Sequence, residues 1–341
     1  MNRQYGALRG LAIVLVVLNH SIHFGLMISP VGGFWFRFLA FFQSFGLFAV
    51  PTFLFISGAF LSFAADGLSA KFLWASFERI LCPYLIWSLV FSLLATLSGD
   101  VHYSVSGYLK NILVGYPYHF VPLLFFCYLT APVLVWLVKR DQWVWCWLVI
   151  AAYQILLLCL RYPSIFGLPF ALPGWVNLLK PPVLFQTMAD WAIYFPTGLI
   201  LGLNNSTLRP RLLKLKWISL AAVVILYLLS GLTSVGVLSA RWARFVAPLP
   251  VVLLLPLIER KRIPLLNFFE RVGKQSYGVY LVHFIVIHLM VLFGTRVIPK
   301  FQSWPVVVPT VFIGALMVSL TLAEELKKRG STVKAHRYIF G

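Results

Sequence analysis

Apolar residues in this chain are gathered into ten long stretches separated by short polar connections. They lie at residues 8–29, 41–64, 80–98, 119–138, 142–160, 186–203, 217–237, 243–258, 277–293 and 305–323. Each is close to the roughly 20 residues that an α-helix needs to cross a hydrocarbon core of about 30 Å. The pattern therefore predicts an all-α fold, a polytopic integral membrane helical bundle with about ten transmembrane helices.

The composition excludes a soluble globular domain. Hydrophobic residues make up 61% of the 341 residues, charged residues make up only 11%, and the mean hydropathy is +0.90. Soluble domains carry about 25% charged residues. The first apolar stretch is too long for the apolar region of a cleavable signal peptide and lacks a small-residue cleavage site, so we expect it to remain as a membrane helix.

The distribution of Lys and Arg predicts the orientation of the chain in the membrane. With ten spans and a cytoplasmic N-terminus, eight of the 28 basic residues fall outside and the other twenty fall inside. Basic residues accumulate in cytoplasmic loops, as this assignment requires. Those outside are Arg37, Lys110, Arg161, Lys180, Arg241, Arg244, Arg296 and Lys300. An even number of spans then puts both termini in the cytoplasm, where residues 324–341 form a basic tail.

The sequence does not indicate a nucleic-acid surface, a disulfide framework or a metal site. The formal net charge is +19, but the basic residues are scattered through short loops, whereas a nucleic-acid surface needs them clustered on one face of a soluble domain. Membrane lipid is therefore the expected partner, and nucleic acid is not. The four Cys residues lie within spans without a C-x-x-C pair, and the seven His residues lack metal-ligand spacing. We therefore predict neither a disulfide framework nor a metal site.

Ionisable residues lie inside the first apolar stretch, where burial in lipid is costly and marks them as functional candidates. We select Arg9 and His20, in a segment made mostly of Leu, Ile, Val, Ala and Gly, in which His23 follows one turn after His20. At about 100° per residue, eleven steps return to within about 20° of the same helix face and advance about 16 Å along the axis. We therefore expect Arg9 near one membrane interface and His20 near the midplane.

The segment from Leu8 to His20 resembles the first-helix signature of the membrane acyltransferase-3 family, in which an arginine and a histidine are separated by ten residues. Three further segments agree with that family in type and order. They are residues 53–61, which contain Ser-Gly, residues 78–84, which open with Glu-Arg, and residues 273–283, which contain Ser-Tyr-Gly-Val-Tyr. The chain is thus similar to a single membrane acyltransferase domain over residues 1–341.

The resemblance implies an activity that hydropathy does not. Members of this family move acyl groups, commonly acetyl from cytoplasmic acetyl-CoA, onto hydroxyls of glycans or other acceptors at the far side of the membrane. Acetyl-CoA is then a substrate and no cofactor is bound permanently. The family also implies the bacterial inner (plasma) membrane. No esterase-like extracytoplasmic domain follows the spans, so the carbohydrate acceptor is expected to bind to the bundle, to its external loops or to a partner protein.

His20 is the expected catalytic residue. An imidazole near the midplane can accept the proton of an attacking hydroxyl, and a positioned general base typically contributes 10²–10⁴-fold to a rate. His20 can instead carry the acyl group covalently between donor and acceptor. The structural alternative is a buried histidine that is hydrogen-bonded to a neighbouring helix.

Arg9 and Arg79 are the expected donor-binding residues. The planar guanidinium of Arg9 suits the phosphates of a CoA donor, although an ordinary arginine at the inner interface is the alternative. Relatives often carry two basic residues three apart in the first cytoplasmic loop. In this chain Ser76 precedes Arg79 at that spacing, and Lys71 is the nearest substitute.

Three polar residues share one face of the ninth apolar stretch. Ser276, Tyr280 and His283 fall at positions i, i+4 and i+7 and so point the same way, into the bundle. They can orient the acceptor or His20, or they can serve only as polar contacts between helices.

Two weaker candidates lie elsewhere in the sequence. Ser57 adjoins Gly58 in the second stretch, where small residues let helices approach closely, and packing is the favoured interpretation. His119 begins the fourth stretch on the outer side, near the expected arrival of the acceptor, although interfaces hold such residues for ordinary reasons.

Other functional classes compete with the acyltransferase interpretation. A carrier exporting a lipid-linked or small anionic solute would use Arg9 and Arg79 as anion contacts and His20 as a proton relay. We find no internal repeat and no paired broken spans, which argues against it, whereas the near absence of intramembrane carboxylates argues for it. A scaffold without catalysis leaves the shared face of Arg9 and His20 unexplained.

Overall fold

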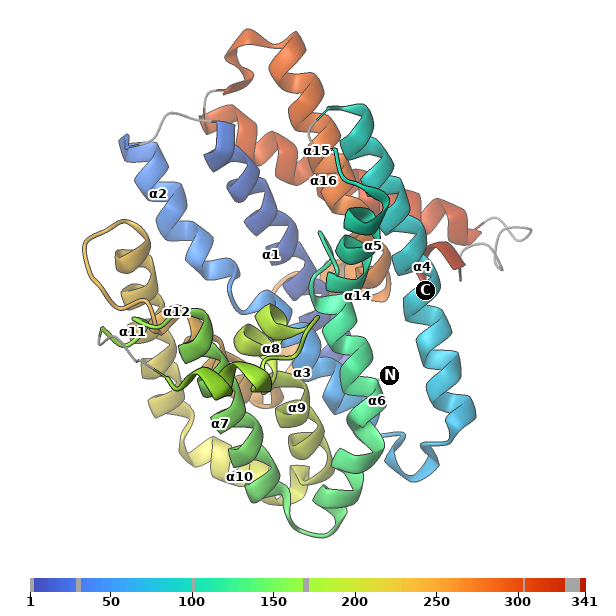
Figure 1. The fold of residues 1–341 in the computed structure, drawn as a ribbon, viewed down its shortest axis with the longest axis vertical. Helices are drawn as coiled ribbons and strands as arrows, with labels where there is room; N and C mark the ends of the chain where they lie inside the picture. The colour runs from blue at the N-terminus through green and yellow to red at the C-terminus, as the bar shows by residue number, and fades with distance from the viewer. Residues whose placement is uncertain (1–2, 29–31, 100–101, 168–171, 303, 329–337) are drawn as a thin grey trace. The chain divides into compact units, whose positions relative to one another are not determined.

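The fold is helical throughout the part of the chain that the structure describes. The computed structural model describes residues 3–28, 32–99, 102–167, 172–302, 304–328 and 338–341. Across these residues it contains α-helices and short 3-10 helices and no β-strand (Figure 1). Eight helical segments in this part are long and apolar enough to cross a membrane, at Arg3–Ile28, Phe34–Ser62, Ala70–Leu97, Phe120–Lys139, Trp143–Arg161, Lys216–Ser234, Ser276–Val297 and Val307–Lys327. The prediction of an all-α polytopic membrane bundle is therefore confirmed.

The two remaining apolar stretches, 186–203 and 243–258, are helical but interrupted. They contain α8 (Phe185–Trp191), α9 (Tyr194–Leu203), α12 (Ala243–Val246), α13 (Pro248–Leu254) and a 3-10 turn (Leu255–Leu257). In the second of them, prolines at 248, 250 and 256 remove backbone N–H donors and clash with the preceding turn. Eight of the ten predicted spans thus match helical segments of spanning length, one of which, Phe34–Ser62, contains a 3-10 turn at Ser44–Gly46, and two are broken into shorter pieces.

One buried glutamine forms hydrogen bonds with backbone groups at the break between α8 and α9. Gln154 lies on α7 (Trp143–Arg161) and is 6% exposed. Its Oε1 accepts a hydrogen bond from the backbone N–H of Ile193 at 2.9 Å, and its Nε2 donates to the carbonyl of Asp190 at 3.2 Å. Backbone groups released by a helix break need such partners at membrane depth. Gln154 therefore stabilises the interruption.

Replacing Gln154 with leucine is expected to destabilise the protein. The variant leaves the N–H of Ile193 and the carbonyl of Asp190 without this partner, and each buried unsatisfied group costs about 1–3 kcal/mol. The measurement is thermal unfolding of the purified protein in detergent. Gln142→Leu, at an exposed position before the same helix, is the matched control. Equal melting temperatures for the two variants would contradict the role given to Gln154.

The chain forms two compact units. The middle unit contains residues 50–77 and 113–259, and the terminal unit contains residues 2–49, 78–112 and 260–341. Both units therefore combine segments that lie far apart in the sequence. The middle unit is built from α8, α9, α12 and α13 together with α3 (Ala49–Ser62), α6 (Phe120–Lys139), α7, α10 (Asn205–Lys214) and α11 (Lys216–Ser234).

Helices α3 and α9 of the middle unit approach each other through glycines. A Cβ atom at Gly58 would lie 2.1 Å from the carbonyl oxygen of Phe195, and one at Gly198 would lie 1.9 Å from that of Phe55. No side chain larger than hydrogen fits at such separations. The approach is the close helix contact that the Ser-Gly pair of the second apolar stretch favours.

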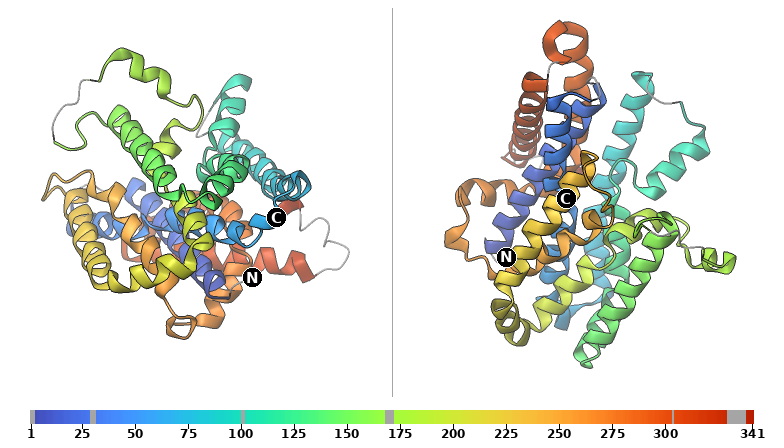
Figure 2. Two further views of the ribbon diagram at one scale, coloured as in Figure 1. Left: turned by 90° about the horizontal axis from the view of Figure 1, so that it is seen from below. Right: turned by 90° about the vertical axis from the view of Figure 1, so that its left-hand side faces the viewer.

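Helix α1 (Arg3–Ile28) is the main packing element of the terminal unit. It contacts α2 (Phe34–Gln43), α14 (Leu266–Lys274), α15 (Ser276–Val297) and α16 (Trp304–Lys328). Helices α15 and α16, orange to red in Figure 2, pack against each other as well. The closest approach is between α1 and α14, where a Cβ at Gly10 would lie 1.9 Å from the carbonyl oxygen of Phe269. The backbones of these two helices are therefore in direct contact.

The C-terminal residues dock into the same unit. Phe340 is 2% exposed and packs in a cluster with Val282 of α15 and Ala323 of α16. The indole N–H of Trp87, on α4 (Ala70–Leu97), donates to the carbonyl of Ile339 at 2.8 Å. The predicted basic tail thus begins within α16, which ends at Lys328, and its last residues lie against three helices. The stretch 329–337 of that tail lies outside the described residues.

Candidate functional site

Two histidines that are far apart in the sequence face each other in the terminal unit. The ring centroids of His20, on α1, and His283, on α15, are 5.3 Å apart. His283 is 1% exposed and His20 is half-buried. The ring of Phe284 lies 5.0 Å from that of His20 and 5.9 Å from that of His283, so it contacts both. The packing of α15 against α1 creates this pair.

Hydrogen bonding assigns the two ring nitrogens of His283 to different roles. Its Nδ1 lies 3.2 Å from the carbonyl oxygen of Val279. A carbonyl only accepts, so Nδ1 carries the proton, and Nε2 of the neutral ring is an acceptor. Nε2 is buried and has no hydrogen-bond partner among the described residues. Because an unsatisfied buried acceptor is costly, this atom is suited to receive an N–H or O–H that enters the site.

Aromatic rings surround the histidine pair. Phe24 of α1 and Phe91 of α4 lie 5.3 Å and 5.6 Å from Phe284, measured between ring centroids. Tyr280 is 5% exposed, and its ring lies 5.6 Å from that of His283. Packing of this kind excludes water from His283, which is 1% exposed, and electrostatic interactions strengthen where water is excluded.

Arg9 is held at the beginning of α15. Its Nε donates a hydrogen bond to the hydroxyl oxygen of Ser276 at 2.6 Å. Ser276 is fully buried and Arg9 is half-buried. Sequence analysis selected these two residues separately, and the tertiary structure joins them. Because Ser276 and His283 share one helix face, α15 contacts both Arg9 and His20.

Arg79 lies near the same end of the terminal unit. It is exposed on α4, next to Ile80. The hydroxyl of Tyr277, the residue after Ser276, donates to the carbonyl of Ile80 at 2.6 Å. The first turn of α15 therefore contacts α4 beside Arg79 and α1 at Arg9, which brings the two candidate donor-binding arginines to one end of the unit.

Ser57 and His119 belong to the middle unit. The hydroxyl of Ser57 donates to the carbonyl of Phe53 in its own helix at 2.8 Å. His119 immediately precedes α6, and its ring lies 5.7 Å from that of Tyr116. The structure shows local contacts for these two residues and does not bring them together.

Sequence reasoning did not select two residues beside the histidines. Phe284 contacts both imidazoles, and Asn19, next to His20, has a buried Oδ1 without a hydrogen-bond partner among the described residues. A Cβ at Gly46 would lie 2.6 Å from the Cβ of Asn19, so the glycine makes room for this side chain. The only available signal was their adjacency to His283 and His20, because a lone Phe or Asn has no distinctive spacing. Within the described residues, no group of three or more His, Cys, Asp or Glu side chains could hold a metal ion.

Comparison with known proteins identifies one family. The family model of acyltransferase 3, described as an acyltransferase domain, matches residues 2–324. The resemblance carried by the four sequence segments is therefore confirmed. Comparison with curated proteins found no match, and comparison with solved structures found none either.

Proposed function

Since the chain belongs to the acyltransferase-3 family and is therefore a membrane acyltransferase, we propose that it moves an acetyl group from cytoplasmic acetyl-CoA to a hydroxyl of an extracytoplasmic glycan or related acceptor. The observation that carries this proposal is the pairing of His20 with His283 beside aromatic rings, where His283 lies on α15, the helix whose first turn also holds Arg9. The arrangement supplies a base and an anion contact on the same pair of helices, α1 and α15.

His20 acts on the acceptor hydroxyl in the proposed mechanism. The hydroxyl oxygen attacks the thioester carbonyl, the carbon–sulfur bond breaks, and the hydroxyl proton passes to His20 and then to the departing thiolate. In the covalent variant, a ring nitrogen of His20 attacks the thioester first, and the acceptor hydroxyl then attacks the acyl-imidazole. Both variants need a ring nitrogen of His20 that faces the substrate.

His283 would orient the imidazole of His20. Its Nδ1–H is bonded to the carbonyl of Val279, so its Nε2 is a free acceptor on a ring whose centroid lies 5.3 Å from that of His20. A hydrogen bond from one nitrogen of His20 to this atom would turn the other nitrogen toward the substrate. Such an orienting partner is the general requirement of a nucleophile–base arrangement.

Arg9 and Arg79 would bind the phosphates of the donor. Guanidinium groups form charge-assisted bonds with phosphate oxygens. The donor arm would then run along α1 over about 16 Å, the axial rise between Arg9 and His20. In this orientation, the Arg9 end of α1 and both termini lie in the cytoplasm. The membrane is then the bacterial inner membrane, as in other members of the family. A partner protein can complete acceptor binding.

Substituting Ser276 with alanine is expected to weaken donor binding. Arg9 loses the hydroxyl that fixes its guanidinium, and a hydrogen bond to a charged group contributes about 1.5–3 kcal/mol. The KM for acetyl-CoA should rise about tenfold, with a smaller change in kcat. Steady-state kinetics on the purified protein measure both. Ser230→Ala, a buried serine of the middle unit, should leave KM unchanged. An unaltered KM in Ser276→Ala would contradict the anchoring role of Ser276.

The activity itself is tested in cells that lack the protein. Surface glycans and secreted metabolites are compared by mass spectrometry with and without complementation by the wild-type gene, before and after mild alkali. An alkali-labile acyl ester that returns with the wild type supports the proposal and identifies the acceptor and the acyl group. Loss of a whole metabolite or glycan from outside, with no ester difference, would instead favour a carrier.

A further inference from the structure

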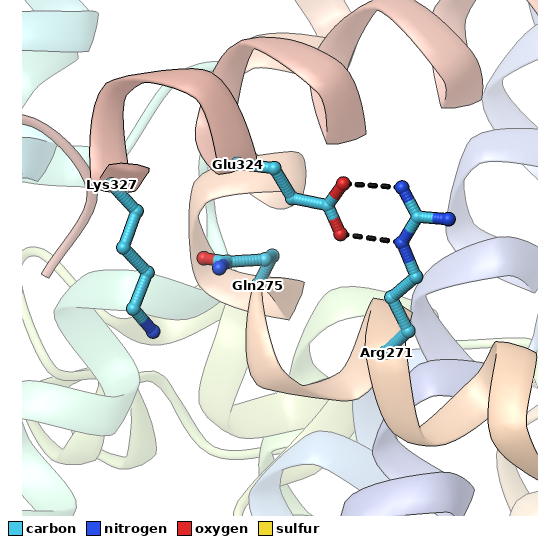
Figure 3. Close-up of a pocket in the computed structure, with 4 residues that line it drawn as sticks. All are labelled: Arg271, Gln275, Glu324 and Lys327. Carbon is cyan, nitrogen blue, oxygen red and sulfur yellow. Dashed lines mark hydrogen bonds and ion pairs between the residues drawn. The ribbon is translucent and has the colours of Figure 1, made fainter. Parts of the chain in front are cut away.

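A charged hollow lies beside the first turn of α15. It has a volume of about 410 Å³ and is lined by Arg271, Gln275, Glu324 and Lys327 (Figure 3). These residues come from the end of α14, the residue before α15 and the last turns of α16. Two cations and one carboxylate give the lining a formal charge of +1. All four belong to the terminal unit.

Gln275 is a largely buried residue whose side-chain amide has no hydrogen-bond partner among the described residues. It is 9% exposed, and its side chain lines the hollow and points toward Lys327 in Figure 3. The side chain makes no capping bond to α15, and no hydrogen bond joins it to another described residue. Although the residue as a whole is buried, its amide atoms open into the hollow, where their N–H groups are available to a bound acceptor. A bound acceptor in the hollow would satisfy it.

The start of α15 adjoins this hollow through Gln275. Gln275 is the N-cap of this 22-residue helix, and the first intrahelical hydrogen bond is that from the N–H of Val279 to the carbonyl of Gln275. The N–H groups of the preceding residues and the helix dipole favour an anion at that end.

Arg271 and Glu324 form a pair that an anion can reorganise. Nε of Arg271 donates to one carboxylate oxygen of Glu324 at 2.6 Å, and Nη2 donates to the other. Lys327, one turn along α16, is exposed and presents its ammonium to the same hollow. A phosphate group carries a charge of about −1.5 to −2 at neutral pH and competes with a carboxylate for such a guanidinium.

We propose that this hollow is a binding site for the phosphate group of a ligand, held by the side chains of Lys327, Gln275 and Arg271. The phosphate can come from the nucleotide part of the acyl donor or from the headgroup of an anionic lipid. Gln275 adjoins Ser276, the anchor of Arg9, and so the site lies beside the expected donor-binding residues. The phosphate site stands without the proposed function, whereas the donor as its source rests on it.

Binding to the purified full-length protein tests the site. The first probe is adenosine 3′,5′-bisphosphate, whose binding is measured by calorimetry. The second is vesicles of phosphatidylglycerol or of phosphatidylcholine, whose binding is measured by co-flotation. The protein and the vesicles are mixed at a detergent concentration too low to dissolve the vesicles. Lys327→Ala and Gln275→Leu should weaken binding of the effective probe about tenfold, as expected for loss of a charge-assisted or buried hydrogen bond. Lys261→Ala, which removes an exposed positive charge of the same unit away from the hollow, is the matched control.

Glu324→Gln gives the opposite expectation. It removes the negative charge of the hollow and releases Arg271 from its carboxylate, so phosphate should bind several-fold more tightly. If the Arg271–Glu324 pair serves only to join α14 and α16, Glu324→Gln will instead leave binding unchanged or weaken it. That result would overturn the proposal.

The remaining outcomes are equally decisive. Binding of the bisphosphate with the expected variant effects identifies the donor as the source, and effects confined to phosphatidylglycerol identify the lipid. Binding of neither probe, or equal binding by all variants, would overturn the site. Phosphate binding in a protein that produces no acyl ester in cells would contradict the proposed function alone, and acyl transfer without any effect of the hollow variants would contradict this inference alone.

Discussion

Replacing His20 with alanine is expected to reduce acyl transfer by about 10²–10⁴-fold, the usual contribution of a positioned base, and further if the imidazole is the acyl carrier. The variant should remain folded and inserted, because His20 is half-buried and alanine is a good helix former. The measurement is the rate of ester formation at matched protein levels. Near-normal transfer by His20→Ala would rule out the mechanism.

His23→Ala provides the matched control for this experiment. His23 lies one turn further along the same helix, and its side chain is exposed. Its loss should leave the rate within a few-fold of the wild type, so the pair of variants separates a role of His20 from a general effect on α1. Incubation with donor in the absence of acceptor then distinguishes the two mechanisms. A mass increase of one acyl group, lost in His20→Ala, indicates the covalent route.

Replacing Gly10 with alanine is expected to produce a large loss of stability. The added Cβ would lie 1.9 Å from the carbonyl oxygen of Phe269 and 2.9 Å from the backbone nitrogen of Gly273. Both neighbours are backbone atoms, so relief requires α1 and α14 to separate. Overpacking of this kind typically costs about 1–3 kcal/mol and occasionally more. The apparent melting temperature in detergent and the fraction that elutes as a single species by size exclusion should both fall.

The control for this substitution is Gly67→Ala. A Cβ at Gly67 meets nothing within 4 Å, so the same chemical change should leave stability nearly unaltered. A Gly10→Ala variant as stable as Gly67→Ala would show that the α1–α14 contact tolerates a wider spacing. Since Gly10 adjoins Arg9, a stable variant with weakened donor binding would separate the two roles of this segment.

Local sequence was sufficient for the class of fold and for the relation of Arg9 to His20. Hydrophobic stretches of spanning length predict membrane helices because the requirement is met by each segment alone. The spacing of eleven residues fixes a shared face because both residues lie in one helix, α1. The same reasoning placed Ser276, Tyr280 and His283 together on α15, and all three are buried.

Hydropathy and helical periodicity did not predict the interruptions of two spans. Average hydropathy does not respond to the position of a break, and residues 186–203 and 243–258 are apolar throughout much of their length. The break between α8 and α9 depends on Gln154, which lies 39 residues before Ile193. A hydrogen bond across that separation leaves no periodic trace in either segment.

The sequence by itself determined an all-helical membrane fold with an arginine and a histidine on one face of its first helix, because those features depend on composition and periodicity, and its resemblance to a family indicated an acyltransferase. Only the tertiary structure decided that His283 faces His20, that Ser276 holds Arg9, and that Gln275 opens into a hollow with Arg271 and Lys327. These contacts join residues up to 267 positions apart. They are set by the packing of α1, α14, α15 and α16, in which glycines bring the backbones of α1 and α14 into direct contact.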